Sequence, residues 1–371
     1  MIPFNPQLAH LAPYPPGKPI EEVQRELGLE RVIKLASNEN PLGPSPRALD
    51  ALRAHAGELQ LYPDGAAHRL RSAVAAHLDI DPARLIFGNG SDEILLLLAL
   101  AYLGPGSQMI QSQYAFVRPS MHAALTGAET KEIPVIPRHF EQDVEAMAYS
   151  AGPKTRMVYL ANPNNPTGDM VNGDRVKALL EHLPESCLFV LDEAYHEYCR
   201  DEPHCERALE WIEDHPNLVV CRTFSKAYGL AGLRCGYAVA HPEVIQTLER
   251  VRPPFNVSRA AQEAAIAALE DHEHLARTIE TNRRGMAQLI EGLRGAKVDL
   301  TPSHGNFLLM DVRRPAQAVF QALLRRGVIV RPQHGAGLLT HLRVSIGTGE
   351  ENALFLSALR GVLAEMAEGR V

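Results

Sequence analysis

Short apolar runs alternate with amphipathic stretches along the middle of the chain. The runs predict strands, and the stretches with a helical period predict helices. The predicted strands are 85–87, 108–111, 157–161, 188–191, 218–222 and 236–240, and the predicted helices include 69–78, 174–183 and 243–251. This alternation is typical of a mainly parallel sheet covered by helices on both faces. We therefore predict an α/β fold with a three-layer αβα domain.

Proline-rich segments divide the chain further. The first 45 residues are rich in proline and include one short helical pattern, so they predict an arm that lies across a neighbouring domain or subunit. After Phe255 comes a long helical region with a break near Asp271, followed by short strands and a last helix, as expected for an α+β domain. The predicted division is an N-terminal arm over 1–45, a large cofactor-binding domain over 46–255 and a small domain over 256–371. The elements predicted outside the large domain are helices 21–29, 258–293 and 350–367 and strands 306–310, 328–330 and 342–346.

Polar residues follow two of the predicted strands where each strand ends. The run 188–191 leads into Asp192 and Tyr195, and the run 157–161 leads into the Pro/Asn/Gly turn 162–168, which contains Asn165. Ligands of doubly wound sheets bind outside the carboxyl ends of the strands. Asp192 alone would also suit a helix cap or a solvated loop.

One lysine lies in the segment Cys221-Arg-Thr-Phe-Ser-Lys-Ala-Tyr-Gly-Leu-Ala-Gly-Leu-Arg234. A lysine is a nucleophile only when it is neutral, and a nearby cation lowers its pKa. Thr223, Ser225 and Arg234 are residue types that bind phosphate. A lone Ser-Lys pair would equally suit the start of a surface helix, but this grouping favours Lys226 as the residue that holds pyridoxal 5'-phosphate, which carries both an aldehyde and a phosphate.

A phosphate-binding turn is also predicted where 85–87 leads into Gly88-Asn-Gly-Ser-Asp-Glu93 and a following apolar helix. Gly90 permits a tight turn, Ser91 can cap the helix, and the first helical amides face an anion. Alone, this motif would also fit an ordinary strand-to-helix turn. It matches neither a Walker loop nor the full dinucleotide fingerprint.

The remaining cofactor contacts are predicted at the ring. Asp192 can pair with the pyridine nitrogen and keep it protonated, so that the ring accepts electrons from the substrate's α-carbon. Tyr195 and Asn165 can donate hydrogen bonds to the ring's 3-oxygen.

Two arginines end or interrupt short apolar runs near the C-terminus, and surface ion pairs are the alternative role for both. Arg331 follows 328–330, and Arg343 lies within 342–346. A guanidinium binds a carboxylate or a phosphate in a bidentate manner. One pocket containing both arginines could therefore accept either a carboxylate or a phosphate ester.

Composition sets limits on the class of protein. The net charge of -7 and the absence of Lys/Arg tracts argue against a nucleic-acid partner. Five cysteines without a Cys-x-x-Cys pair suggest reduced thiols in a cytoplasmic protein and no metal site. The longest apolar stretch, 94–103, is too short to cross a bilayer, and the N-terminus lacks the pattern of a signal peptide.

At this level of detail the chain resembles the fold-type I pyridoxal-phosphate-dependent aminotransferases (class II), and within them the histidinol-phosphate aminotransferase family. The likeness covers nearly the whole length. The lysine segment and Asn-Pro-Thr-Gly are shared among aminotransferases, whereas the segments 11–18, 34–46 and 342–348 are more selective. The motifs are Leu11-Ala-Pro-Tyr-Pro-Pro-Gly-Lys18, Lys34-Leu-Ala-Ser-Asn-Glu-Asn-Pro-Leu-Gly-Pro-Ser-Pro46, Leu61-Tyr-Pro-Asp64, Asn162 to Gly168, Thr223-Phe-Ser-Lys226, Arg252-Pro-Pro-Phe-Asn256 and Leu342-Arg-Val-Ser-Ile-Gly-Thr348.

The resemblance implies a role for each matching position. Lys226 would bond the cofactor and then act as the base that moves the substrate's α-proton, with Asp192 and Tyr195 as its catalytic partners. Tyr62 would reach the cofactor phosphate of the partner subunit, so the active site would need a homodimer. The implied cofactor residues are Gly90, Ser91, Asp92 (a weaker candidate), Tyr114 (stacked on the ring), Asn165, Asp192, Tyr195, Thr223, Ser225, Lys226, Arg234 and the partner's Tyr62. The implied substrate residues are Tyr14, Asn38, Tyr62, Asn165, Asn306, Arg331 and Arg343.

The implied reaction is amino transfer between histidinol phosphate and 2-oxoglutarate, which gives imidazole acetol phosphate and glutamate in histidine biosynthesis, with aromatic amino acids as possible secondary donors. A pyridoxal-dependent decarboxylase or lyase would share nearly every cofactor residue. A cofactor-binding sensor domain of a transcriptional regulator is a third alternative, but no basic DNA-binding module precedes residue 30, and Lys226 and Asp192 are both present. One position departs from the family pattern, since Arg118 stands where an aromatic residue is common.

Overall fold

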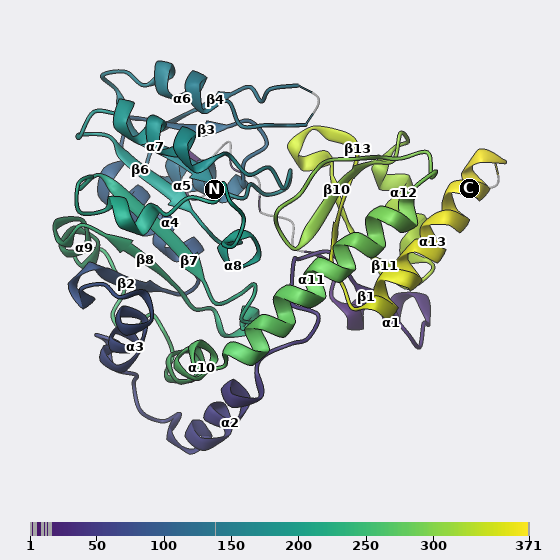
Figure 1. The fold of residues 1–371 in the computed structure, drawn as a ribbon, viewed down its shortest axis with the longest axis horizontal. Coiled ribbons are helices and arrows are strands. Elements are labelled where there is room, and N and C mark those ends of the chain that lie inside the picture. The colour runs from purple at the N-terminus through teal and green to yellow at the C-terminus, as the bar shows by residue number, and fades with distance from the viewer. Residues whose placement is uncertain are drawn as a thin grey trace.

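The computed structural model describes residues 2, 6–8, 11, 13, 17–137 and 139–369, and the chain folds into two lobes joined by a long helix (Figure 1). The larger lobe contains a seven-stranded sheet in the order β2-β8-β7-β6-β5-β3-β4. Its strands are parallel except β8, which is antiparallel to both β2 and β7. The strands are β2 (Leu85–Gly88), β3 (Gln108–Ser112), β4 (Glu129–Ile133), β5 (Thr155–Ala161), β6 (Leu188–Asp192), β7 (Leu218–Thr223) and β8 (Gly236–Ala240).

Helices cover both faces of this sheet. One face packs against α2 (Pro46–His55), α3 (His68–Leu78), α6 (Val144–Ser150), α7 (Gly173–His182) and α10 (Arg259–Leu269). The other face packs against α4 (Ser91–Tyr102), α5 (Val117–Leu125) and α9 (Pro242–Glu249). The predicted three-layer αβα arrangement is confirmed.

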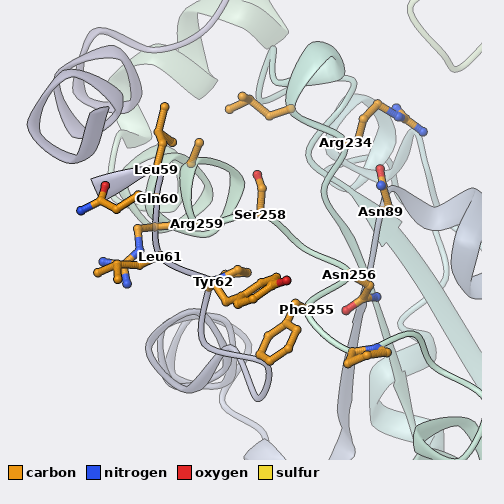
Figure 2. A pocket seen from close by; sticks show the side chains of 14 residues that line it. Leu59, Gln60, Leu61, Tyr62, Asn89, Arg234, Phe255, Asn256, Ser258 and Arg259 are labelled. Carbon is orange, nitrogen blue, oxygen red and sulfur yellow. The ribbon is translucent and has the colours of Figure 1, made fainter. Parts of the chain in front are cut away.

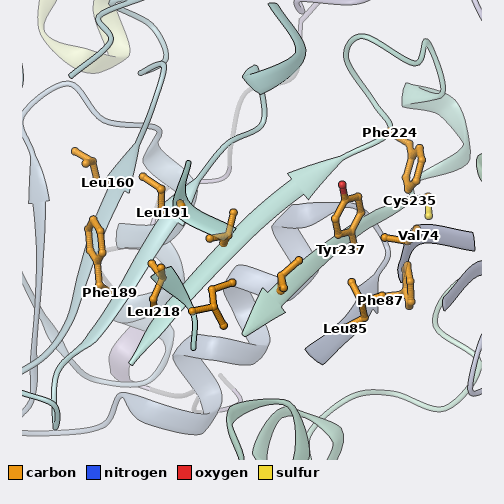
Figure 3. Close-up of a cluster of buried hydrophobic side chains, with 14 of the residues drawn as sticks. Val74, Leu85, Phe87, Leu160, Phe189, Leu191, Leu218, Phe224, Cys235 and Tyr237 are labelled. Carbon is orange, nitrogen blue, oxygen red and sulfur yellow. The ribbon is translucent and has the colours of Figure 1, made fainter. Parts of the chain in front are cut away.

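The two layers arise from the alternation of side chains along each strand. On β5, Val158 and Leu160 point to the face that carries α7, whereas Met157 and Tyr159 point to the face that carries α4. Successive side chains of a strand point to opposite faces, so a strand that is apolar at every position must be covered on both. Figure 3 shows the first of these clusters, in which side chains of several strands, among them Leu160 and Phe189, pack side by side.

The smaller lobe combines an antiparallel sheet with three helices of its own and the C-terminal part of a fourth, α11 (His272–Leu293). The sheet order is β12-β13-β10-β9, and a separate parallel pair joins β1 to β11. In Figure 1 this pair brings the purple N-terminal segment beside the yellow-green C-terminal one. The strands are β1 (Ile33–Lys34), β9 (Asp299–Leu300), β10 (Phe307–Asp311), β11 (Val328–Ile329), β12 (Arg331–Gln333) and β13 (Leu338–Ser345). The helices of this lobe are α1 (Ile20–Leu27), α12 (Ala316–Leu324) and α13 (Gly349–Ala367).

The predicted break in the long helical region is confirmed at Asp271. Helix α10 ends at Leu269, and α11 (His272–Leu293) begins after Asp271, whose side chain accepts a hydrogen bond from the His274 amide at 3.1 Å. An aspartate in this position satisfies a helical amide that lacks an intrahelical partner. Because the chain turns here, α10 stays on the large sheet while α11 crosses to the small lobe (Figure 1).

The remaining regular elements are short. They are the helix α8 (His196–Cys199) and the 3-10 turns η1 (Pro6–Leu8), η2 (Ala56–Glu58), η3 (Pro82–Arg84), η4 (Ala208–Trp211), η5 (Ala231–Leu233) and η6 (His334–Ala336). No helix among the residues described above is both long and apolar enough to cross a bilayer.

Most predicted elements lie where the structure has them, within a few residues. The edge strand β4 has no counterpart among the predicted strands, because its sequence Glu-Thr-Lys-Glu-Ile is largely polar and exposed. The boundaries at 45 and 255 stay predictions. The packing adds that α10, although it follows residue 255, belongs to the core of the large sheet.

Neighbouring residues on α11 allow a test of the small-lobe core. Leu289 is fully buried against this core, whereas Ile290 is 45% exposed. We expect Leu289→Ala to lower the free energy of unfolding by about 2–5 kcal/mol, because it leaves a cavity. Ile290→Ala is the matched control and should change that free energy far less. Urea titrations followed by circular dichroism compare the two, and equal losses would contradict the packing.

Candidate active site

Three adjacent parallel strands bring the predicted catalytic residues together. Asp192 is the last residue of β6, and in register it lies beside Ala161 of β5 and Cys221 of β7. Lys226 follows the end of β7 by three residues. The carboxyl ends of β5, β6 and β7 therefore meet at one edge of the sheet. This is the edge at which ligands of doubly wound sheets bind, as the sequence predicted.

Lys226 is held between the two lobes. Its Nζ donates a hydrogen bond to the Ser37 carbonyl at 3.1 Å and lies 5.8 Å from the centre of the Tyr195 ring. Burial, together with the nearby charges of Arg343 and Arg234, lowers the pKa of Lys226 to about 8. A substantial fraction of this amine is therefore neutral near physiological pH, as a nucleophile or base requires.

Asp192 is a buried acid with neutral hydrogen-bond donors. The Tyr159 hydroxyl donates to Oδ2 at 2.8 Å, and the Ala194 amide donates to Oδ1 at 3.1 Å. Burial raises the pKa of Asp192 to about 6 despite these two hydrogen bonds. A cation at this carboxyl group would lower the pKa again, so the site suits a protonated pyridine nitrogen.

A hydrogen-bonded network connects the ring-binding candidates to the small lobe. The Asn38 amide donates to the Tyr195 hydroxyl at 2.9 Å, and the Asn306 amide donates to the Asn38 carbonyl at 3.0 Å. Arg343 donates to Asn165 Oδ1 at 2.6 Å and to the Ala36 carbonyl at 2.6 Å. The structure therefore brings together Asn38, Asn165, Tyr195, Asn306 and Arg343 from distant parts of the sequence.

The predicted phosphate-binding residues converge at the start of α4. The Arg234 guanidinium lies so close to Gly90 that a Cβ there would come within 2.5 Å of Nη2, and Gly90 has φ +79°. Arg234 Nη1 is also 3.5 Å from Ser225 Oγ. The N-terminal amides of this twelve-residue helix, which begins at Ser91, point to the same place. An arginine, a hydroxyl group and a helix N-terminus together form a site that fits a phosphate.

Thr223 holds the turn after β7 through hydrogen bonds with backbone groups. Its hydroxyl accepts a hydrogen bond from the Ser225 amide at 3.1 Å and donates to the Cys235 carbonyl at 3.4 Å. These contacts fix the turn after β7, so Thr223 orients the segment that carries Ser225 and Lys226.

Tyr114 lies on the loop between β3 and α5 with φ +59°. Its carbonyl accepts a hydrogen bond from the Asn164 amide at 3.2 Å, and its ring packs edge-on against Phe140 at 5.5 Å between ring centres. The turn that carries Asn165 therefore also holds the loop of the predicted ring-stacking residue.

The carboxylate of Asp92 is paired within the large lobe. Arg118 donates to both of its oxygens through Nε and Nη2, at 2.9 to 3.2 Å, and His122 Nε2 lies 3.0 Å from Oδ1. Burial alone would raise the pKa of Asp92, but His122 and Arg118 bring it down to about 2. Arg118, the departure from the family pattern, thus joins α5 to the start of α4, and the Asp92 carboxylate is engaged by Arg118 and His122.

The two predicted substrate arginines face each other across neighbouring strands. Arg331 on β12 and Arg343 on β13 are direct partners in the antiparallel register. Arg343 also lies 5.6 Å from the centre of the Phe307 ring. The pairing places two cations side by side at the small-lobe end of the site.

Tyr62 lies at the surface of its own chain. It is 79% exposed, stacks on Phe255 at 4.8 Å between ring centres, and lines a surface pocket of about 560 Å³ that Arg234 also lines (Figure 2).

Tyr14 lies outside the described residues, so its predicted role stays untested. Within the described part of the chain, no cluster of three or more His, Cys, Asp or Glu side chains is arranged to hold a metal ion.

The sequence-based prediction missed several contacts. Tyr159, Ser37, Arg118 and His122 touch site residues, yet none was a candidate. Tyr159 lies within an apolar strand, and only the register between β5 and β6 brings its hydroxyl to Asp192. Ser37 lies within the quoted motif Lys34–Pro46, and Arg118 was noted as a departure from the family pattern, but neither was named for a contact.

Similarity to known proteins agrees with this geometry. A family model for aminotransferases of class I and II matches residues 30–359. Histidinol-phosphate aminotransferase 1 of Nitrosococcus oceani is 47% identical over 96% of this chain and 95% of its own length. Histidinol-phosphate aminotransferase 2 of Pseudomonas aeruginosa is 48% identical over 97% of both chains. The chain belongs to the class I and II aminotransferases and, within them, to the histidinol-phosphate aminotransferase family.

Solved structures support the same assignment. The crystal structure of histidinol-phosphate aminotransferase from Sinorhizobium meliloti, in complex with pyridoxal-5'-phosphate, superposes with a TM-score of 0.90 at 31% identity over 98% of both chains. Aspartate aminotransferase from Thermus thermophilus superposes with a TM-score of 0.83 at 24% identity over 99% of this chain and 100% of its own, which shows the shared fold alone.

The pKa of Asp192 predicts a pH dependence of stability in the cofactor-free protein. Between the ordinary value of 3.8 and about 6 the folded chain binds more protons than the unfolded chain, so stability should fall as pH rises through this range. The expected loss is about 3 kcal/mol. Asp192→Asn should remove it, whereas Asp201→Asn, at an exposed carboxylate, should not. Urea unfolding at pH 4 to 7 measures the effect, and parallel curves for the wild type and Asp192→Asn would refute it.

Proposed function

We propose that the protein transfers an amino group reversibly between L-histidinol phosphate and 2-oxoglutarate, giving imidazole acetol phosphate and glutamate, with pyridoxal 5'-phosphate as cofactor. The observation that carries this proposal is the position of a pKa-lowered lysine between a phosphate-binding turn and a pair of substrate arginines. Relatives named histidinol-phosphate aminotransferase that match nearly the whole chain support it.

The residues of the site fit the cofactor at each of its functional groups. Gly90, Ser91, Ser225 and Arg234 would hold the phosphate, and Asp192 would pair with the ring nitrogen. Asn165 and Tyr195 would contact the 3-oxygen, and Tyr114 would stack on the ring. When bound, the cofactor supplies an aldehyde and an electron-accepting ring that stabilises negative charge on the substrate's α-carbon.

Lys226 would supply both the attachment point and the base. Its Nζ is partly neutral near pH 8 and accepts a proton readily in that form. The Ser37 carbonyl orients the amine, and the positive charges of Arg343 and Arg234 keep its proton affinity low. A base with a pKa near the working pH is the most effective general acid–base catalyst.

Asp192 would stabilise the protonated ring as an ionised partner. Tyr159 and Ala194 hold its two oxygens in place, so the carboxylate needs little reorganisation when a cation arrives. The Tyr195 hydroxyl accepts a hydrogen bond from the Asn38 side-chain amide, which would orient the phenol to donate to the 3-oxygen.

The arginine pair explains how one pocket would serve two substrates. Histidinol phosphate offers a phosphate ester and no carboxylate, whereas glutamate offers carboxylates. Arg331 and Arg343 are cross-strand neighbours, and a guanidinium binds either anion. As an extension, aromatic amino acids would serve as weaker donors, because the same arginines can bind their α-carboxylate.

A homodimer would complete the site. Tyr62 and several neighbouring apolar side chains are exposed in one chain, among them Leu59, Leu61 and Phe255. An exposed apolar patch beside a phosphate-binding turn suits an interface through which Tyr62 reaches the partner's cofactor phosphate. The five cysteines are all free thiols, which suits a cytoplasmic enzyme.

A pyridoxal-dependent decarboxylase is the alternative. L-threonine-O-3-phosphate decarboxylase of Porphyromonas gingivalis superposes with a TM-score of 0.79 at 22% identity over 90% of this chain and 100% of its own, which shows only a common fold. A decarboxylase needs no keto acid to regenerate its cofactor, so the need for an acceptor separates the two functions.

A single-turnover experiment tests the proposed reaction. We expect the holoprotein mixed with L-histidinol phosphate alone to release close to one equivalent of imidazole acetol phosphate per chain, measured by mass spectrometry. Adding 2-oxoglutarate should restore turnover and produce glutamate. Continued product formation without an acceptor, or none with one, would overturn the assignment.

Substitution of the lysine tests its role as a base. Lys226→Ala should lower turnover by at least about 10²–10⁴-fold, the usual contribution of a positioned acid–base group. Lys226→Arg is the control that retains positive charge but cannot lose its proton. Both variants should be inactive, and full turnover in either would exclude this role.

Tyr62→Phe tests the proposed contact across the interface. Loss of one hydrogen bond to a charged phosphate costs about 1.5–3 kcal/mol, so cofactor affinity should fall about 10–100-fold while the dimer persists. Tyr149→Phe, at another exposed tyrosine, is the control. Equilibrium dialysis and analytical ultracentrifugation give the two readouts, and a fully active monomer would rule out the shared site.

A further inference from the structure

Two cysteines lie close together in the segment that follows Tyr195, and the Cys199 sulfur lies 4.0 Å from the Tyr195 carbonyl oxygen. Cys199 is the last residue of α8, and Cys205 lies in the loop that follows it. Their sulfur atoms are 3.8 Å apart. Cys199 is buried and Cys205 is partly exposed, so one sulfur can be reached from solvent while the other lies beneath it.

The surroundings give the two thiols different chemistry. The Cys199 thiol is directed to the His196 carbonyl at 3.6 Å, and the Cys205 sulfur lies 4.0 Å from His196 Nδ1. The hydrogen-bonding contact with Cys199 lowers the pKa of Cys205, and the contact with His196 lowers it further, against the opposing effect of burial. The contact with Cys205, together with burial, raises the pKa of Cys199. Cys205, the more exposed of the two and the one beside His196, is therefore the sulfur that more readily becomes a thiolate.

The other three cysteines are not candidates. Cys187, Cys221 and Cys235 are fully buried. Burial raises the pKa of Cys187 and of Cys235 to about 12 and that of Cys221 well above its usual value. A thiol that stays protonated and out of reach of solvent does not react with small oxidants.

We propose that Cys199 and Cys205 form an oxidisable dithiol, a modification site for small hydroperoxides such as hydrogen peroxide. The segment between them, residues 200–204, is mostly exposed, and a shift of roughly 2 Å would bring the sulfurs from 3.8 Å to the roughly 2 Å of a disulfide bond.

The reaction balances with peroxide as the oxidant. The Cys205 thiolate attacks one peroxide oxygen, the O–O bond breaks, and the departing hydroxide takes a proton to become water. Cys205 is thereby oxidised to a sulfenic acid. The Cys199 thiol then attacks that sulfur, the S–O bond breaks, and a second water leaves. Two thiols and one hydrogen peroxide give one disulfide and two waters.

A disulfide here would join two segments that carry site residues, and this consequence rests on the proposed function. Cys199 follows Tyr195 by four residues. Glu206, next to Cys205, accepts a hydrogen bond from the Asn162 amide at 2.7 Å, at the start of the turn that carries Asn165. Oxidation should therefore displace Tyr195 and Asn165, the two residues proposed to donate to the cofactor's 3-oxygen. Cofactor affinity should then fall at least severalfold and recover on reduction.

The experiment uses the full-length holoprotein, reduced and then treated with a small excess of hydrogen peroxide. We expect loss of two of the five thiols, measured with Ellman's reagent under denaturing conditions, and a mass decrease of two hydrogens. Peptide mapping without reductant should locate the Cys199–Cys205 link. Unchanged thiols, or a link between other cysteines, would overturn the proposal.

Matched variants separate the two roles. Cys199→Ser should leave Cys205 as a sulfenic acid that dimedone traps, whereas Cys205→Ser should give neither disulfide nor trapped adduct. Equal dimedone labelling of both variants would contradict the assignment of the thiolate. If the disulfide forms but cofactor affinity, measured by dialysis, does not change, the link to the active site is wrong while the dithiol stands. Both thiol measurements are independent of whether the chain transaminates.

Discussion

The site depends on the parallel register of β5, β6 and β7. Because these strands run in the same direction and end together, Asp192, the Asn162–Gly168 turn and the segment before Lys226 emerge at one edge of the sheet. The apolar layers on both faces hold that register, since a shift of one residue would send every buried side chain of a strand to the opposite layer. Catalytic geometry is thus a consequence of the packing of the core.

Burial then sets the charge states of the two central groups in opposite directions. It lowers the pKa of Lys226 to about 8 and raises that of Asp192 to about 6. Each shift means that the charged form is poorly solvated where it stands. For the lysine the result is an amine that is partly neutral near physiological pH, and for the aspartate it is a carboxyl group that gains from a cationic partner. The cofactor proposed for the site offers an aldehyde to the first and a pyridinium to the second.

The small lobe completes the site from the other side. Its sheet pairs Arg331 with Arg343, and Arg343 reaches across to Asn165 of the large lobe. The N-terminal segment contributes too, because the parallel pairing of β1 with β11 brings Ser37 and Asn38 next to Lys226 and Tyr195. The residues proposed for substrate recognition and for ring binding are therefore joined by direct hydrogen bonds between the two lobes, while the Cys199–Cys205 pair lies on the large lobe.

The sequence alone determined the kind of fold and the chemistry of the individual residues. Apolar runs of strand length, turns rich in Pro, Asn and Gly, and a lysine flanked by phosphate-binding residues are local patterns, and local patterns predicted most strands within a few residues. The edge strand β4 was not predicted, because its side chains are mostly exposed and polar and so form no apolar run. Only the tertiary structure decided which residues meet. Tyr159 reaches Asp192 through strand register, Arg118 pairs with Asp92 between two helices, and Arg331 faces Arg343 across an antiparallel pair. Contacts between residues far apart in the chain depend on how the layers pack, and no local pattern carries that information.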